Sequence, residues 1–539
     1  MRYLFKQVLL RDVVYDMQLR KRLHDLHRRA AAAIEELHSD DLAPYYAELA
    51  YHYGQAGLEE QERQYSLWAG QRAVQEYANE EAVNFLTRAL ELTPQEEREE
   101  WGEILLAREE LYSLQGNRLA QRRDLQTLLF LAEGEQKALA VLRQSQYAEL
   151  VGNYTGSVSS AQRAVKLAQQ HQNVELETGA YLQWGRSIWR QGRYQEAAPY
   201  IQQALDLARQ ATLPLLEAEA LRNLGNIYWC EVDYPTAMEY YQQALPRYRA
   251  LKNQRGESAT LNNMGIVLRD QAAYAQARHY STQALKIKEA IGDQIGAGIA
   301  YASLGEIEYY LGRYEQARKY HQRSLFLSQE AADSPGECGA LLSLGRVAYQ
   351  QGYYERAREY GQASLAKGKT LGDLHIQGYV YLYLGRIAVA QQDFPTARDA
   401  YRQSLARHLE LNQLHLTLEP LVGLAEIELL QGKPELALPL VEQALSKFHF
   451  PADINAVAQK AETLLTGAYD PFYVYLTCYR VWQAGHDPRA ESILRAGALN
   501  LRARAEQISE PELRRSFLEN VFQHRELLAA ADTVVSAFA

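Results

Sequence analysis

Cysteine is scarce in this sequence and long apolar runs are absent, and each shortage excludes a class of protein. Its three cysteines, Cys230, Cys338 and Cys478, lie more than a hundred residues apart. Zinc and redox sites need cysteines at short spacing, so neither is predicted, and a reducing cytoplasm is favoured. No stretch of about 18 uncharged apolar residues occurs, so no membrane span is expected. The N-terminal residues MRYLFKQVLLRDVVYD carry charges and lack a signal-peptide core.

An excess of positive charge and recognisable catalytic patterns are also missing. The formal net charge of -10 disfavours binding to nucleic acid or to an anionic membrane by the chain as a whole. No Ser-His-Asp or Cys-His arrangement can be recognised, so we expect no catalytic residue and no cofactor. His24 and His27 could share one helix face, but no third metal ligand lies near them. We expect these histidines to be solvated or to face a partner, and no metal to be bound.

Residues 363–370, ASLAKGKT, fit a loose form of the phosphate-binding loop. A genuine loop of this kind follows a β-strand and opens a helix, so that backbone N–H groups surround the phosphate. Here the preceding residues have the pattern of a helix, and Lys367, Gly368 and Lys369 fall at its C-terminal end. Basic residues and glycine are favourable at that end of a helix. The pattern therefore predicts a helix end and no ATP site.

What the sequence has in abundance is repetition. A Leu-Gly pair, or a close equivalent, returns every 40 residues, followed by a turn, an aromatic residue, a small residue three positions later and a small-Leu pair. The pairs begin at Trp184, Leu224, Met264, Leu304, Leu344, Leu384 and Leu424, and the aromatic residues are Tyr194, Tyr234, Tyr274, Tyr314, Tyr354 and Phe394. Seven copies in one phase predict a solenoid of stacked helix pairs.

Each position in the repeat has a physical role. The glycine and the small residue let neighbouring helices approach closely, and the aromatic residue opens the second helix and fills the wedge between the two. Apolar residues three and four positions apart give each helix a core stripe. One unit cannot bury its stripe alone, so the units must stack.

These positions resemble the tetratricopeptide repeat (TPR), as Leu304, Gly305, Tyr314, Ala317 and Ser324 show in one copy. The resemblance implies an all-α fold, a TPR α-solenoid that forms a right-handed superhelix of antiparallel helix pairs. The usual unit has about 34 residues, so the 40-residue unit predicts longer helices and a polar joint. HEAT repeats have a similar period but lack the Gly-aromatic-Ala pattern.

Both ends of the chain resemble a second group of proteins. Residues 5–15, FKQVLLRDVVY, are similar to the end of the ATPase arm in STAND-type signalling ATPases, including bacterial class III adenylate and guanylate cyclases with ATPase and TPR regions. Phe5, Lys6, Asp12 and Tyr15 match, whereas Gln7 stands where histidine is usual. Residues 508–528 resemble the C-terminus of such proteins. The resemblance implies that the chain is the sensor or regulatory part of an assembly with an upstream ATPase or cyclase module.

Four regions are expected from these patterns. They are a helical segment resembling the end of the ATPase arm (1–40), irregular TPR-like helices (41–135), the regular array (136–445), and a region with a phase break, a terminal TPR-like pair and capping helices (446–539).

The predicted binding surface is the concave face, which the first helices of the repeats should line. The predicted groove residues are Arg186, Trp189, Arg222, Asn223, Asn226, Trp229, Asn262, Asn263, Arg269, Glu306, Tyr309, Arg346, Tyr349 and Arg386. Asparagine can pair with a peptide backbone, arginine with carboxylates, and aromatic residues and arginine are common anchors. We therefore expect a protein or peptide ligand, with an acidic one favoured.

Other interpretations of the same residues remain open. Many of them could be ordinary exposed helix residues, with Trp189 and Trp229 buried between repeats. At the level of function, a small-molecule sensor, a self-associating structural scaffold and an enzyme using the loose phosphate-binding pattern are the alternatives.

Overall fold

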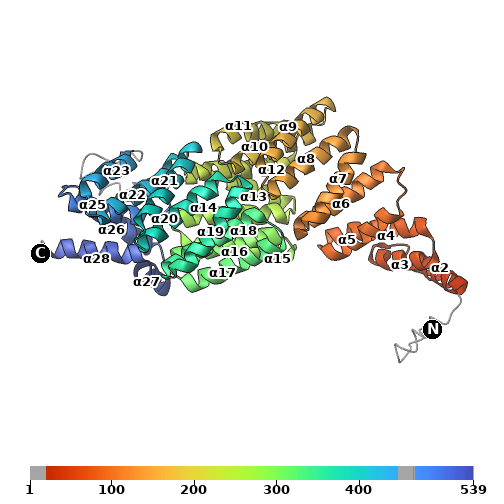
Figure 1. The fold of residues 1–539 in the computed structure, drawn as a ribbon. Helices are drawn as coiled ribbons and strands as arrows, with labels where there is room; N and C mark the ends of the chain where they lie inside the picture. The colour runs from red at the N-terminus through yellow and green to blue at the C-terminus, as the bar shows by residue number, and fades with distance from the viewer. Residues whose placement is uncertain (1–19, 447–464, 466–467, 538–539) are drawn as a thin grey trace, which may run out of the picture. The chain divides into compact units, whose positions relative to one another are not determined.

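The 40-residue repeat folds as pairs of antiparallel helices, most of them 17 residues long. The computed structural model describes residues 20–446, 465 and 468–537 (Figure 1). After α8 (Gly134–Leu150), the first helices of the repeats are α10 (Val174–Arg190), α12 (Pro214–Cys230), α14 (Gln254–Asp270), α16 (Gln294–Tyr310), α18 (Ser334–Gln350), α20 (Leu374–Ala390) and α22 (Leu418–Leu430), the last preceded by the 3-10 turn η2 (Leu414–Thr417). The second helices are α9 (Tyr154–Gln170), α11 (Tyr194–Gln210), α13 (Tyr234–Ala250), α15 (Tyr274–Ala290), α17 (Tyr314–Glu330), α19 (Tyr354–Leu371), α21 (Phe394–Glu410) and α23 (Pro434–Ser446).

Local sequence sets the ends of these helices. The repeated aromatic residue is the first residue of each second helix from α11 to α21, as the pattern predicts. Asn253 and Asp293 cap α14 and α16 by accepting a hydrogen bond from the N–H group three residues later. The turn inside each repeat requires a left-handed residue. Gly312 supplies it without strain (φ 72°), whereas Val232 adopts φ 66° at an energetic cost.

The small residues of the repeat allow the close packing that was predicted. A Cβ atom on Gly225 would lie 2.5 Å from Cε1 of Tyr241 on α13, so only glycine fits there. The recurrent alanine of the second helix is fully buried in all seven copies, at Ala197, Ala237, Ala277, Ala317, Ala357, Ala397 and Ala437. The core of the array is thus a continuous line of small residues with aromatic and aliphatic side chains packed between them.

By its internal contacts the chain divides into two compact units, residues 1–140 and 141–539, with the division inside α8. The helices of the first unit are α2 (Arg20–Leu37), the 3-10 turn η1 (Ala43–Tyr45), α3 (Tyr46–Ala56), α4 (Glu59–Gln75), α5 (Asn79–Leu92), α6 (Arg98–Gln115) and α7 (Arg118–Leu131). Leu86, Ile104 and Leu105 are among the buried residues of its core.

The expected exposure of the first unit's histidine pair is wrong for His27. His27 is buried, because α2 packs against α3, and its Nδ1 lies 2.7 Å from Nδ1 of His52. Among the residues that the structure describes, no three His, Cys, Asp or Glu side chains are grouped so as to hold a metal ion.

The second unit ends in four helices that continue the stack. They are α25 (Pro471–Ala484), α26 (Ala490–Glu506), α27 (Pro511–Glu519) and α28 (Phe522–Ala537). Helix α25 packs on α22 and α23 in the place of a next first helix, α26 pairs with it, and α28 contacts both. Trp482 on α25 is fully buried. Phe517 on α27 packs 5.9 Å from the ring of Tyr274, so the last helices also contact the middle of the array.

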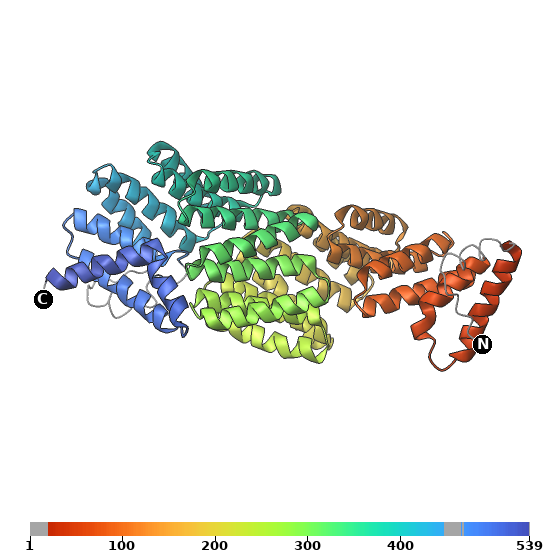
Figure 2. The ribbon, with the colours of Figure 1, turned by 90° about the horizontal axis from the view of Figure 1, so that it is seen from below.

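Successive turns of the superhelix in the second unit touch one another. The Tyr194 hydroxyl accepts a hydrogen bond of 3.1 Å from Nε2 of Gln413, 219 residues later. Asn520 donates similarly to the carbonyl of Gly312. Figure 2 shows the paired helices of the array lying side by side. These contacts tie the curvature of the array to particular side chains in its loops.

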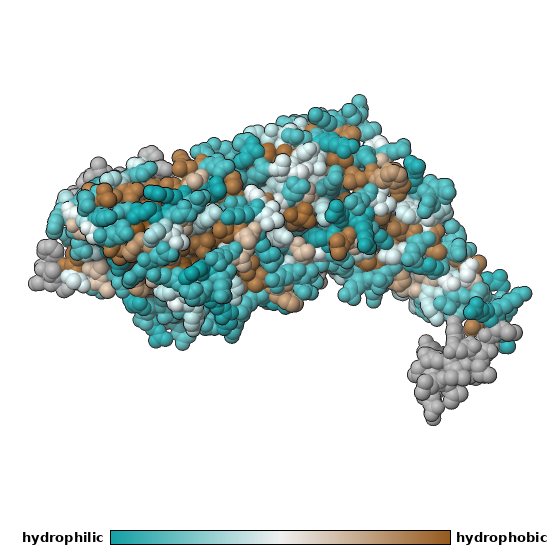
Figure 3. Space-filling model, in the orientation of Figure 1, coloured by the Kyte–Doolittle hydropathy of each residue, from teal (hydrophilic) through white to brown (hydrophobic). Residues whose placement is uncertain are grey.

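None of the helices described here is both long and apolar enough to cross a membrane. On the face shown in Figure 3, hydrophilic residues surround the hydrophobic patches.

Candidate binding groove

The first helix of each repeat contacts the first helix of the next, from α10 to α22, and together they line one inner face. Polar side chains on this face bond across neighbouring first helices, and their partners lie 37, 40 or 41 residues apart. Such pairs are Asn226–Asn263, Glu306–Arg346 and Trp229–Asp270. The repeat therefore generates a ladder of polar contacts along the groove.

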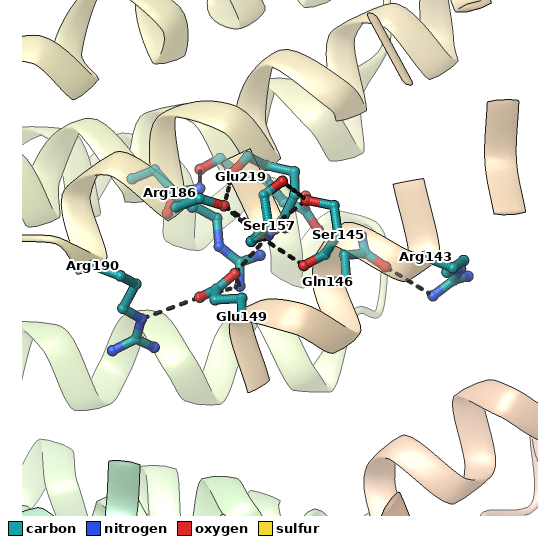
Figure 4. Close-up of polar contacts among 11 residues, drawn as sticks. Arg143, Ser145, Gln146, Glu149, Ser157, Arg186, Arg190 and Glu219 are labelled. Atoms are coloured by element: carbon teal, nitrogen blue, oxygen red, sulfur yellow. Dashed lines mark hydrogen bonds and ion pairs between the residues drawn. The ribbon is translucent and has the colours of Figure 1, made fainter. Parts of the chain in front are cut away.

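At the N-terminal end of the groove a buried carboxylate gathers three side chains of α10 (Figure 4). Glu149 on α8 accepts hydrogen bonds from Gln183 (2.8 Å), Arg186 (2.9 Å) and Arg190 (3.1 Å). Burial acts to raise the pKa of Glu149, but the two guanidinium groups outweigh it and lower the pKa to about 2. Glu149 therefore stays charged and holds both arginines at the groove surface.

In the middle of the groove, asparagine and tryptophan side chains join α12 and α14. Nδ2 of Asn263 donates to Oδ1 of Asn226 (2.7 Å), which also accepts from the Tyr241 hydroxyl (2.8 Å). Nε1 of Trp229 donates to Asp270 (2.7 Å). Both asparagines and Trp229 remain partly exposed.

Further along, Glu306 on α16 pairs with Arg346 on α18, with both carboxylate oxygens 2.8 Å from Nη1. Arg346 is 2% exposed and its guanidinium lies 4.3 Å from the ring centroid of Tyr309. Nε2 of His321 lies 3.7 Å from Glu306. Burial lowers the pKa of His321 to about 4, although Glu306 acts in the opposite direction. His321 is therefore neutral at pH 7.

The C-terminal part of the groove contains residues of the chain that precede α25. Asp470 pairs with Arg386 on α20 (2.9 Å). The Tyr469 ring lies over the guanidinium of Arg346, at 4.7 Å. The backbone N–H groups of Tyr469 and Asp470 donate to Oε1 of Glu419 on α22 (2.6 and 3.1 Å). This part of the groove is occupied by the chain itself.

The predicted groove residues divide by exposure. Arg186, Trp189, Arg222, Asn226, Trp229, Asn263, Arg269, Glu306 and Tyr349 are partly exposed, whereas Asn223, Asn262, Tyr309, Arg346 and Arg386 are buried. Nδ2 of Asn223 donates to the carbonyl of Glu219 within its own helix (2.8 Å), and this bond directs the amide away from a ligand.

Sequence reasoning missed the acidic partners of the groove arginines. Glu149, Asp270 and Asp470 pair with arginines in the groove, and they balance the basic groups that favoured an acidic ligand. For Glu149 and Asp270 a usable signal existed, because each lies 37 or 41 residues from the side chain that it contacts. For Asp470 the sequence held no such signal, since this residue precedes α25 and its distance from Arg386 does not match the period of the repeat.

A cavity of about 1140 Å³ lies in the second unit where the loops of successive superhelical turns meet. Tyr154, Tyr194, Cys230, Gln413 and His415 are among its lining residues. Burial raises the pKa of the Cys230 thiol to about 12, so this cysteine is not a reactive thiolate. Polar and apolar surface line the cavity about equally, and its residues lie in loops and at helix ends instead of on the faces of the first helices.

The loose phosphate-binding pattern lies within a helix. Residues 363–370 belong to α19, which ends at Leu371 and is capped by Gly372 in the left-handed conformation (φ 66°). Lys369 lies 5.9 Å from the ring of Tyr381. The predicted helix end at these residues is therefore confirmed.

A family model for the tetratricopeptide repeat matches residues 177–250, 216–290, 296–369 and 377–448. The array is built of tetratricopeptide repeats. This confirms the predicted all-α fold, a TPR solenoid wound as a right-handed superhelix of helix pairs. No curated protein matches the chain in sequence.

Solved structures of TPR proteins resemble this chain in fold. The APC/C hetero-tetramer Cut9-Hcn1 aligns with 14% identity over 88% of this chain and 93% of that chain, with a TM-score of 0.50. A Rap protein complexed with Competence and Sporulation Factor aligns with 16% identity over 72% and 98% (TM-score 0.49). A STAND protein with a tetratricopeptide repeat sensor from Pyrococcus horikoshii aligns with 16% identity over 75% and 55% (TM-score 0.42).

Proposed function

We propose that this chain is a TPR scaffold without a catalytic site, which binds a protein or an extended peptide in the groove of its second unit. The observation that carries the proposal is the inner face from α10 to α16, where Arg186, Asn226, Asn263 and Trp229 are partly exposed and held in place by neighbouring repeats. Side chains fixed in advance lose little entropy on binding, which favours recognition of an extended ligand. The long curved surface of a solenoid suits the same kind of partner.

The chain's place in a larger assembly is part of the proposal. The resemblance of residues 508–528 to the C-terminus of STAND-type proteins supports a role as the sensor or regulatory part of a signalling ATPase or cyclase. These residues include α27 and the first part of α28, which close the array. The other resembling stretch, residues 5–15, lies outside the described residues. The net charge and the three free cysteines support action in the cytoplasm, with no nucleic-acid or membrane partner.

Signal transmission would use the curvature of the array. A ligand that prefers one curvature shifts the population toward it. The contacts between superhelical turns, such as Tyr194 with Gln413, are the ones that a change of curvature must break or form.

A small-molecule sensor is the second candidate, and the cavity of about 1140 Å³ between the turns favours it. Its volume is about that of the larger ligand pockets, which span about 300–1,000 Å³. About half of its lining surface is polar, whereas small-molecule sites are mostly apolar, so the cavity fits such a site less well. Peptide binding in the groove is therefore the better supported function.

Affinity capture from the native host with matched variants tests the proposal. Asn226→Ala/Asn263→Ala removes the amide pair from the groove. Gln202→Ala/Asp206→Ala removes a comparable hydrogen-bonded pair (2.9 Å) from the exposed side of α11. Synthetic peptides that cover the sequence of a captured protein are then tested for binding. One of them should bind the native chain and the Gln202→Ala/Asp206→Ala variant but not the Asn226→Ala/Asn263→Ala variant. Equal binding to all three forms would contradict the proposal.

A further inference from the structure

The last two residues before α25, Tyr469 and Asp470, lie outside the pattern of the repeat and contact the groove. In the regular array three residues, such as 251–253, join a second helix to the next first helix. Between α23 and α25 the chain instead has residues 447–470. Two described residues at the end of this stretch, Tyr469 and Asp470, lie on the groove faces of three consecutive first helices.

The Tyr469 side chain is bound by two of these helices. Its ring stacks on the Arg346 guanidinium of α18 at 4.7 Å, and it packs 5.0 Å from Tyr379 and 6.2 Å from Tyr383 of α20. A guanidinium between aromatic faces is a strong anchor for an aromatic side chain.

The Asp470 carboxylate and the backbone of both residues are bound by α20 and α22. Oδ2 of Asp470 lies 2.9 Å from Nη1 of Arg386, whose side chain is 1% exposed. Oε1 of Glu419 accepts both backbone N–H groups, at 2.6 and 3.1 Å. Side-chain acceptors for backbone N–H groups are what a groove offers to an extended peptide, because no secondary structure satisfies them there.

Two arginines of the groove have hydrogen-bond donors that no described residue uses. Nε and Nη2 of both Arg346 and Arg386 are buried and have no hydrogen-bond partner among the described residues. Donors of this kind can satisfy a second oxygen of a carboxylate in a bidentate arrangement, which Asp470 does not form.

We propose that the groove across α18, α20 and α22 recognises an extended peptide in which an aromatic residue is followed by an acidic one, and that Tyr469–Asp470 is a built-in competitor for this site. The inference rests on the proposed peptide-binding function and names the ligand class for this part of the groove. An outside peptide must displace Tyr469–Asp470, so its apparent affinity is reduced by the fraction of time that the site is empty.

One variant empties the site while the fold is retained. Tyr469→Ala removes the anchored ring. Asp470 also caps α25, since its Oδ1 accepts from the N–H of Tyr473 (3.2 Å), and asparagine caps as well as aspartate. Asp470→Asn therefore preserves the cap and removes the charge that pairs with Arg386. The double variant Tyr469→Ala/Asp470→Asn is called the emptied chain.

The test is selection from a phage-displayed library of random dodecapeptides on the full-length native chain, the emptied chain, and the emptied chain with Glu419→Gln or Arg386→Met. Thermal unfolding followed by circular dichroism verifies that each variant is folded. We expect the emptied chain to select peptides with Tyr, Phe or Trp followed by Asp or Glu. A selected peptide should bind the emptied chain at least about tenfold more tightly than the native chain. Arg386→Met should abolish the preference for the acidic residue, and Glu419→Gln should weaken binding of every selected peptide.

Selected peptides without the aromatic-acidic pair, or with equal affinity for the native and emptied chains, would overturn the inference. If such peptides lose binding on Asn226→Ala/Asn263→Ala, the proposed groove function stands and only the built-in competitor is refuted. Failure of the emptied chain to select any peptide also overturns it.

Discussion

Glu306 and Arg346 lie one repeat apart, at the same position of consecutive first helices, and form an ion pair of 2.8 Å in the groove. The same position holds Asn226 and Arg386 in other repeats. One position of the repeat thus supplies both polar side chains that line the groove and contacts that join neighbouring repeats.

Removal of the charge on Glu306 should destabilise the array strongly. Glu306→Gln leaves the Arg346 guanidinium, which is 2% exposed, without its charged partner. Loss of one member of a buried pair costs roughly 3 kcal/mol, and urea unfolding followed by circular dichroism measures it.

Glu355→Gln is the control, because it breaks a surface pair with Arg358 in which the Glu355 side chain is 75% exposed. It should leave the urea midpoint unchanged. Equal effects of the two substitutions would show that the Glu306 pair is not important for stability.

Two glycines should respond in opposite directions to alanine. The Cβ of Gly225→Ala would lie 2.5 Å from the Tyr241 ring, so the helices must separate, at a cost of about 1–3 kcal/mol. Gly339 lies inside α18 and a Cβ there meets no atom within 4 Å, so Gly339→Ala should stabilise by up to about 1 kcal/mol. Thermal midpoints of the two variants provide the measurement. If the midpoint of Gly225→Ala is not lowered, the close approach of α12 and α13 is refuted.

Stability should fall as the pH drops from about 6.5 toward 4. Burial lowers the pKa of His321 and His524 to about 4 and that of His408 to about 3. In the unfolded chain these groups titrate near 6.5, so between the two values the unfolded state binds more protons and is favoured. Above about pH 7 both states are neutral and the effect vanishes.

Thermal midpoints of the native chain and of His321→Gln, measured between pH 4.5 and 8, test this prediction. The variant should lose less stability on acidification than the native chain. Parallel curves for the two proteins would mean that His321 becomes protonated as easily in the folded chain as in the unfolded one.

The contact between superhelical turns should be visible in hydrogen exchange. Tyr194→Phe removes the hydroxyl that accepts from Gln413 and leaves the ring. One hydrogen bond is worth about 1 kcal/mol, so amides of residues 410–415 should exchange about fivefold faster. Tyr234→Phe, the same change one repeat later, should leave their exchange rates unaltered. An unchanged rate in the Tyr194 variant would indicate that the turns are not joined by this bond.

The helices of the array were well predicted from the sequence because one 40-residue period marks both the start of each second helix and the small residues that pack between neighbouring helices. The aromatic residue at each second helix start and the buried alanine, such as Tyr274 and Ala277, are in their predicted places. The position of a residue on a helix follows from its spacing, but its exposure does not, and Asn223 and Asn262 of the predicted groove residues are buried.

The partners of the groove residues were less predictable, because they depend on how neighbouring helices are offset. Asn223 and Asn263 occupy the same repeat position, yet Asn223 bonds to its own helix and Asn263 bonds to Asn226. Tyr469 and Asp470 lie outside the repeat phase, so no spacing rule places them against Arg346 and Arg386.

Site-specific photo-crosslinking in the native host tests the central claim, binding in the groove, most directly. Trp229→p-benzoylphenylalanine places the probe on the inner face, next to Asp270. Phe326→p-benzoylphenylalanine places it on the second helix α17, where Phe326 is 49% exposed. We expect the probe at position 229 to form a crosslink to one defined peptide segment of a partner, and the probe at 326 to form none. A crosslink from position 326 alone, or the same partners from both positions, would contradict it.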